Sequence, residues 1–146
     1  MASNLGEKAS FVCDTSGKTV TVYVRGEIDH HTAVDVRNGI DAMLFEKRPN
    51  QLRLELSGVG FMDSSGLGLI MGRLSVMKAL GGGLLLLNPS RETRRILSLA
   101  GIERIVPVAY TGDHGKEQGD VSASEVVFKD VRREERRRIV KKHPSA

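Results

Sequence analysis

The chain has 146 residues, 40% of them hydrophobic, and a formal net charge of +4 at neutral pH. This length suits one domain of roughly 100 residues with an appended segment. With two tyrosines, four phenylalanines and no tryptophan, the chain lacks the exposed aromatic side chains that base-stacking platforms need. No stretch reaches the roughly 18 apolar residues of a membrane span, and the first ten residues contain no apolar signal-peptide core.

The positive charge is concentrated near the C-terminus. Residues 129–142 contain eight basic and three acidic side chains, so this segment carries +5 and leaves −1 for the rest of the chain. The excess of positive charge is therefore a property of one segment. The single cysteine, Cys13, excludes an intramolecular disulfide and indicates a reducing, cytoplasmic compartment. We expect its thiol to be buried and inert.

The first third of the chain predicts a hairpin and a helix. Residues 11–13 and 19–25 flank a turn of small polar residues, and in the second arm valines alternate with polar side chains. Gly26 is expected to end this second strand. A helix is predicted to begin near Thr32, which forms a capping-box-like start with Asp35. The apolar stripe of that helix is Ala33, Val36, Ile40, Met43 and Leu44.

Strands and helices alternate along the rest of the domain. In chain order we expect a strand over 52–57, a helix to about Leu80 that ends at the glycines 81–83, a strand over 84–87, a helix from Ser90 to Gly101 and an edge strand over 105–108. Such an order predicts an α/β fold with a mixed sheet and right-handed crossovers. Because two strands alternate apolar and polar residues, one face of the sheet should be solvated and the helices should crowd the other.

The sequence divides into a domain over 8–110 and a linker with a charged tail over 111–146. Residues 111–119 are rich in Gly, Asp and Lys and read as a linker. Residues 122–142 are predicted to be helical or disordered, because their apolar positions form a broken stripe. These positions are Val127, Val131, Ile139 and Val140.

Basic side chains have two interpretations in this chain. The arginine-rich segment 129–142 is either a solvated, intermittently paired helix or a contact for nucleic acid or an anionic membrane. No aromatic residue interleaves with its arginines, so direct DNA binding is not expected. Arg91, Arg94 and Arg95 on the third helix are either a solvated face or a docking patch for an acidic partner.

The most informative segment is residues 61–68, Phe-Met-Asp-Ser-Ser-Gly-Leu-Gly, where a strand turns into a helix. Asp63 or Ser64 is suited to cap that helix. Ser65 then lies in the first turn, at the positive end of the helix, where an added phosphate is tolerated. Gly66 and Gly68 have no side chains, so they leave room around this turn for a partner or a kinase to approach. An ordinary cap with a spare serine is the other interpretation of this turn.

Several enzyme motifs fail at this turn. Met62 stands where a nucleophile elbow needs glycine, and neither a dinucleotide fingerprint nor a Walker motif occurs. His30 and His31 are adjacent, and Asp29 is the only carboxylate beside them, which does not suit zinc. We therefore expect no catalytic residue, no cofactor and no metal.

Three segments resemble the STAS-domain anti-sigma factor antagonists, and among them the sporulation antagonists of anti-sigma F factors. They are the 61–68 turn, residues 26–33 (Gly-Glu-Ile-Asp-His-His-Thr-Ala) and the pair Gly72-Arg73. The similarity covers about residues 8–110, and the order of strands and helices agrees with that family. It implies a single STAS-type domain, with helices mainly on one face of a mixed sheet. The basic tail after Tyr110 departs from the family pattern.

The resemblance implies a partner-switching cycle. The unphosphorylated protein would bind an anti-sigma factor that is also a serine kinase, and so release the sigma factor. The kinase would phosphorylate Ser65, and a PP2C-type phosphatase would restore the active form. Asp29, Asp63, Ser64 and Gly66 would contribute to partner binding. For Asp29, a role as a helix cap is the other interpretation.

The function expected from the sequence is thus a cytoplasmic regulator of transcription and not an enzyme. A STAS scaffold or ligand sensor, in which Ser65 belongs only to a helix cap, is the alternative function. An enzyme with Ser65 as nucleophile is a third class, for which the sequence offers no base and no oxyanion partner.

Overall fold

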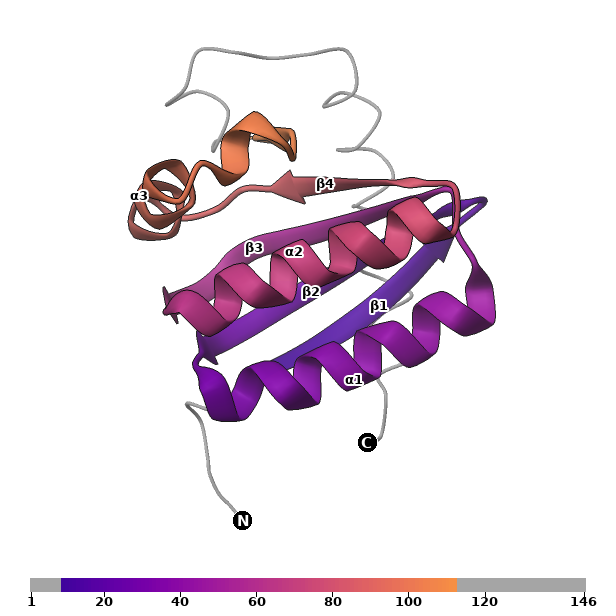
Figure 1. Ribbon diagram of the computed structural model, residues 1–146, viewed down its shortest axis with the longest axis horizontal. Helices are drawn as coiled ribbons and strands as arrows, with labels where there is room; N and C mark the ends of the chain where they lie inside the picture. Colours follow the sequence, from indigo (N-terminus) through magenta and orange to yellow (C-terminus); the bar gives the residue numbers. More distant parts are fainter. Residues whose placement is uncertain (1–8, 113–146) are drawn as a thin grey trace.

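Five strands form one sheet in the order β1-β2-β3-β4-β5, which is also their order in the sequence (Figure 1). The computed structural model describes residues 9–112, so the predicted helix over 122–142 lies outside the described residues. The elements are β1 (Ser10–Ser16), β2 (Thr19–Ile28), α1 (His30–Lys47), β3 (Gln51–Met62), α2 (Ser64–Ala79), β4 (Gly83–Leu87), α3 (Arg91–Leu99), the 3-10 helix η2 (Ile102–Arg104) and β5 (Val108–Ala109).

The strand pairing explains where the helices lie. β1 and β2 form an antiparallel hairpin, and β2, β3, β4 and β5 are parallel to one another. Three successive crossovers step across the sheet in the same direction, and right-handed crossovers of this kind place their helices on one face. Figure 1 shows α1 and α2 side by side over that face. The predicted α/β fold with a mixed sheet and helices on one face is confirmed.

The core lies between this face and the helices. Valines of β2 and leucines of β3 and β4 point into it, and the stripe of α1 packs on them as its period predicts. Leu97 of α3 belongs to the same core, so α3 lies on the same side of the sheet. The strand residues of the core include Val20, Val22, Val24, Leu52, Leu54, Leu56, Leu84 and Leu86.

Glycines end two of the helices as the sequence predicts. At the end of α2, Gly81 has φ +80°, and the N–H of Gly82 donates to the carbonyl of Met77 at 2.8 Å. This is the Schellman arrangement, which satisfies the last carbonyls of a helix. Gly101 follows α3 with φ +76°. Both positions need the left-handed backbone conformation that glycine adopts without strain.

Three boundaries differ from the sequence prediction. Gly26 does not end the second strand, because β2 continues to Ile28 through a register irregularity at which Gly26 takes φ +96°. The first helix begins at His30, earlier than expected, because Asp29 and not Thr32 is its N-cap. The last strand is Val108–Ala109 and starts later than predicted, because residues 102–104 form a 3-10 turn.

The prediction that the second face of the sheet is solvated is wrong for its centre. Asp14, Tyr23 and Glu55 point to the face away from the helices, yet their side chains are 2%, 7% and 2% exposed. Glu55 is shielded by a polar network, in which it accepts from the Asn88 side chain at 2.8 Å. Alternation along a strand identifies which side chains share a face, but it does not reveal what covers that face.

Candidate functional site

Two helix starts lie side by side at one edge of the sheet. Ile28 and Met62, the last residues of β2 and β3, are paired in register. Asp29 and Asp63 follow directly, and each is the N-cap of the next helix. The backbone N–H of Asp63 donates to the carbonyl of Ile28 at 3.1 Å, which joins the two loops. Since parallel strands end at the same edge, the positive ends of α1 and α2 face the same region of solvent (Figure 1).

The predicted cap of the second helix is confirmed at Asp63. Its Oδ1 accepts a hydrogen bond from the N–H of Ser65 at 2.8 Å, and the N–H of Gly66 donates to the Asp63 carbonyl at 2.9 Å. Ser64 is therefore the first and Ser65 the second residue of α2. Ser64 is exposed and Ser65 half-buried, so the Ser65 side chain remains within reach from outside.

Asp29 caps α1 through a capping box. Its Oδ1 accepts from the N–H of His31 and from the N–H of Thr32, each at 2.9 Å, while the Thr32 hydroxyl accepts from the Asp29 N–H at 2.9 Å. The hydrogen bond from Thr32, assisted by that from His31, holds the pKa of Asp29 below its usual value. Within residues 9–112, the second carboxylate oxygens of Asp29 and Asp63 accept no hydrogen bond.

Gly66 is buried, and packing explains why this position is glycine. A Cβ built on Gly66 would lie 2.1 Å from Cγ and 2.7 Å from Sδ of Met62, closer than atoms approach in real structures. Met62 is itself a core residue at the end of β3. Gly68, on the exposed side of the same turn, has open space around it. Gly66 thus lets the first turn of α2 settle on the end of β3.

The structure adds two exposed apolar side chains that the sequence analysis did not select, beside the two histidines. Phe61 lies beside the Asp63 turn with its side chain 50% exposed, and Val34 on α1 is 42% exposed. The rings of His30 and His31 are 4.0 Å apart, and both residues are exposed at the start of α1. The strand period contained the signal for Phe61: Met62 points into the core, so its neighbour has to point outward. The edge therefore combines carboxylates, hydroxyls and a half-exposed aromatic ring.

An ion pair connects the two helices behind this edge. Arg73 of α2 is 4% exposed, and its Nε lies 2.8 Å from Oδ1 of Asp41 on α1, although the two groups are not oriented as a hydrogen bond. Burial lowers the pKa of Arg73, and Asp41 opposes this effect. The pair thus links the middle of α2 to α1.

The described residues offer neither a reactive thiol, nor a metal cluster, nor a membrane-spanning helix. Cys13 is half-buried and not fully buried as expected. Partial burial still raises the pKa of its thiol to about 11, which disfavours the thiolate at neutral pH and agrees with an inert thiol. In residues 9–112 no three His, Cys, Asp or Glu side chains come together as a metal would require. No helix in the same range has the length and apolar character needed to cross a membrane.

Comparison with known proteins places this geometry in a family. Residues 10–114 match the STAS domain. The chain is 38% identical over 85 residues to the anti-sigma F factor antagonist of Lysinibacillus sphaericus, which is 58% of this chain and 73% of that relative. The chain therefore belongs to the STAS domain family, and within it to the anti-sigma factor antagonists.

Two solved structures agree with this assignment. The anti-sigma factor antagonist SpoIIAA in its unphosphorylated form is similar with a TM-score of 0.63 and 27% identity, over 77% of this chain and all of that one. The Bacillus cell fate determinant SpoIIAA in the phosphorylated form is similar with a TM-score of 0.58 and 26% identity, over 82% of this chain and 98% of that one. This chain is thus similar in fold both to the unphosphorylated and to the phosphorylated SpoIIAA structure.

Proposed function

We propose that this chain is an anti-sigma factor antagonist whose partner binding is switched by phosphorylation of Ser65. In the unphosphorylated state it binds an anti-sigma factor with serine kinase activity, and so releases the sigma factor. A PP2C-type phosphatase reverses the modification. The observation that supports this most is the position of Ser65: a half-buried hydroxyl on the second residue of a helix, beside an Asp63 cap.

The edge around Ser65 suits a protein partner. Asp29, Asp63 and Ser64 face solvent there, with the second oxygen of each carboxylate open to a donor from the partner. Gly66 contributes indirectly, because it holds the turn against the sheet. We propose that these four residues contribute to the contact and that no catalytic group is involved.

A phosphate at Ser65 acts on binding more than on folding. It adds about −1.5 to −2 charges, and the N-terminus of α2 favours negative charge. The Asp63 carboxylate, bound to the N–H of the same residue at 2.8 Å, repels it, and a partner surface would have to remove water from the dianion. A differential cost of about 3 kcal/mol weakens binding roughly 100-fold.

Exposure alone would favour the exposed Ser64 over the half-buried Ser65 as acceptor, while the family resemblance assigns Ser65. The test incubates the protein with ATP and candidate anti-sigma kinases of its organism, and locates phosphate by mass spectrometry. We expect Ser65→Ala to bind the kinase without being phosphorylated. Ser65→Asp should keep its melting temperature and bind far more weakly, whereas the matched variant Ser64→Asp should bind more tightly than Ser65→Asp.

Three results would contradict the proposal. Equal partner affinity for the wild type and Ser65→Asp removes the switch. Phosphate on Ser64 moves the switch to the wrong residue. Neither adduct nor complex with any candidate kinase indicates a STAS scaffold or ligand sensor instead, and this outcome also refutes the proposed regulation.

A further inference from the structure

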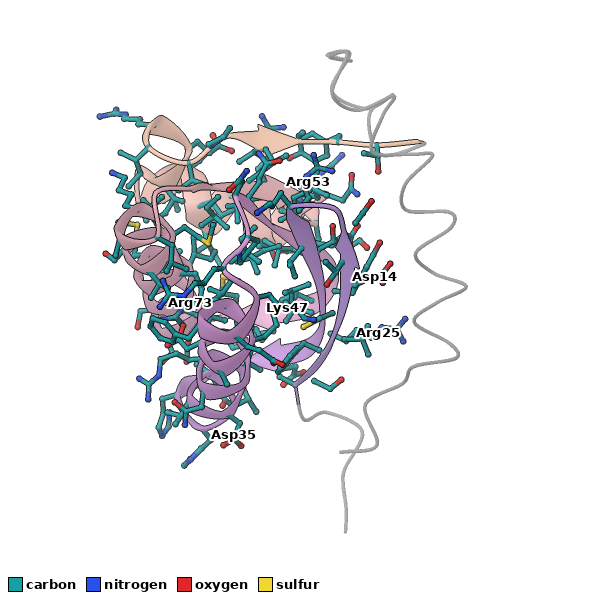
Figure 2. The ribbon with its side chains drawn as sticks, turned by 90° about the vertical axis from the view of Figure 1, so that its right-hand side faces the viewer. Asp14, Arg25, Asp35, Lys47, Arg53 and Arg73 are labelled. Atoms are coloured by element: carbon teal, nitrogen blue, oxygen red, sulfur yellow. The ribbon has the colours of Figure 1, made fainter. Side chains whose placement is uncertain are left out.

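The sheet face opposite the helices is shielded, although no described helix covers it. The three crossovers place α1, α2 and α3 on the other face. Figure 2 shows Asp14 and Arg25 extending from the sheet on the side away from Arg73. We call this side the back face. Its strand residues include Val12, Asp14, Thr21, Tyr23, Arg25, Arg53, Glu55, Leu85 and Leu87.

Tyr23 shows that strand neighbours alone do not explain this shielding. It lies on β2 near the middle of the back face, paired with Val12 of β1 and with Glu55 of β3. A tyrosine on an open sheet stands roughly perpendicular to it and leaves its ring in water. Tyr23 is nevertheless only 7% exposed, and Thr21, two residues earlier on the same face, is fully buried. Something therefore lies over β1 and β2.

The polar network after β4 does not extend that far. It joins Glu55, Asn88 and Thr111, which lie on or beyond β3, β4 and β5. It therefore shields the β3–β5 side of the back face. Within residues 9–112, this network therefore does not account for the burial of Thr21 and Tyr23.

We propose that the C-terminal segment 122–142 docks on the back face as a helix. Its apolar positions, among them Val127 and Val131, would contact the apolar side chains of this face. Asp14 is 2% exposed, and a carboxylate in such a position needs a cation or several donors. The segment's eight basic side chains supply them, and its four acidic ones suit Arg25.

The length of the segment fits this position. Five strands about 4.8 Å apart span about 19 Å, and a helix over 122–142 would be about 31 Å long. The N-terminal residues 1–8 also lie outside the described range, and Leu5 is their main apolar side chain. They are a poorer match, because they offer one basic residue and little apolar surface. Docking on the back face also leaves Asp63 and Ser65, at the strand ends, open to a partner.

The two tyrosines make the back face observable, because the chain has no tryptophan. In a full-length Tyr110→Phe background, all tyrosine emission comes from Tyr23. We would measure its quenching by acrylamide in that background, and compare the double variant Val127→Asp/Val131→Asp with Arg133→Asp. Both change the net charge by −2, but Arg133 lies on the opposite side of the predicted helix.

We expect the quenching constant to rise severalfold in the double variant, toward that of the chain unfolded in urea, and to stay low in Arg133→Asp. Circular dichroism checks that the variants remain folded. Should the double variant unfold, trypsin treatment of the unaltered protein decides: slow cleavage at 132–138 relative to the urea-unfolded chain supports docking, and immediate cleavage refutes it.

Other results would overturn the proposal. A double variant that is folded and as well protected as the parent excludes the C-terminal segment as the cover. Exposure of Tyr23 on Leu5→Asp substitution assigns the cover to residues 1–8. Quenching that rises on dilution of the unaltered protein, with a dimer in gel filtration, assigns it to a second copy of the chain. None of these measurements depends on Ser65 or on a kinase, so they are independent of the proposed switch.

Discussion

Replacing Gly66 and Gly68 separately by alanine tests how the first turn of α2 is built. Both residues lie in the same helix, and alanine in place of glycine stabilises a helix by up to about 1 kcal/mol. At Gly68 the new methyl group meets open space, so Gly68→Ala should raise the free energy of unfolding. At Gly66 it would lie 2.1 Å from Cγ of the buried Met62.

The difference between the two variants isolates the packing cost. Because the gain in helix propensity is similar in both, their stabilities should differ by the cost of overpacking, about 1–3 kcal/mol. For a folded domain of this size, about 4 °C in melting temperature corresponds to 1 kcal/mol. Gly66→Ala should therefore melt roughly 4–12 °C below Gly68→Ala in a thermal scan followed by circular dichroism.

A double-mutant cycle identifies the clashing partner. The smaller side chain in Met62→Ala leaves room for the added methyl group, so Gly66→Ala should cost less in that background than alone. If Gly66→Ala melts at or above Gly68→Ala, or if the two substitutions are additive, Met62 does not occupy the position that fixes this turn. The explanation given for Gly66 would then be wrong.

Three further results are expected from the same domain. Asp41→Ala leaves Arg73 buried without its carboxylate and should lower the free energy of unfolding in urea by about 1–3 kcal/mol, a range kept modest because Asp41 is 26% exposed. Arg73→Met removes the charge and keeps the volume, so it should cost less. The reverse order would contradict the pairing. The pKa of Asp29 is lower in the folded than in the unfolded protein, so Asp29 stabilises the fold at pH values above its unfolded pKa of about 3.9. This stabilisation is lost as the pH falls through the lower folded pKa. Asp29→Asn should flatten this part of the plot of unfolding free energy against pH, and an unchanged plot would refute the capping role of Asp29. With a pKa of about 11, Cys13 should react with Ellman's reagent at pH 8 far more slowly in the folded than in the urea-unfolded protein, and equal rates would show the thiol to be accessible.

Sequence reasoning predicted the order of elements because each one carries its own period. Val20 to Val24 and Leu52 to Leu56 alternate, and the stripe of α1 recurs at helical spacing, so the side chains that face the helices follow directly from the pattern. The Asp63 cap was predictable for the same reason, since it depends on residues adjacent in the chain.

Features that depend on contacts between distant segments could not be predicted. Arg73 and Asp41 are far apart in sequence, and their pairing appears once α1 and α2 lie next to each other. Similarly, Gly66 reads as an access feature in the sequence, whereas its neighbour Met62 makes it a packing requirement.

The back face shows the strongest separation between pattern and outcome. Thr21 and Tyr23 occupy positions that alternate with core valines, so the period predicts water around them, and yet both are buried. A polar position in a strand is solvated only if nothing else in the chain packs on it. A charged segment such as 129–142 is able to pack on the back face, because the apolar stems of arginine and lysine cover surface while their charged ends reach carboxylates. The edge that carries Ser65 is determined by local chemistry at two strand ends, and the burial of the back face by a long-range contact. The two regions lie on different parts of the sheet, so a change in one need not alter the other.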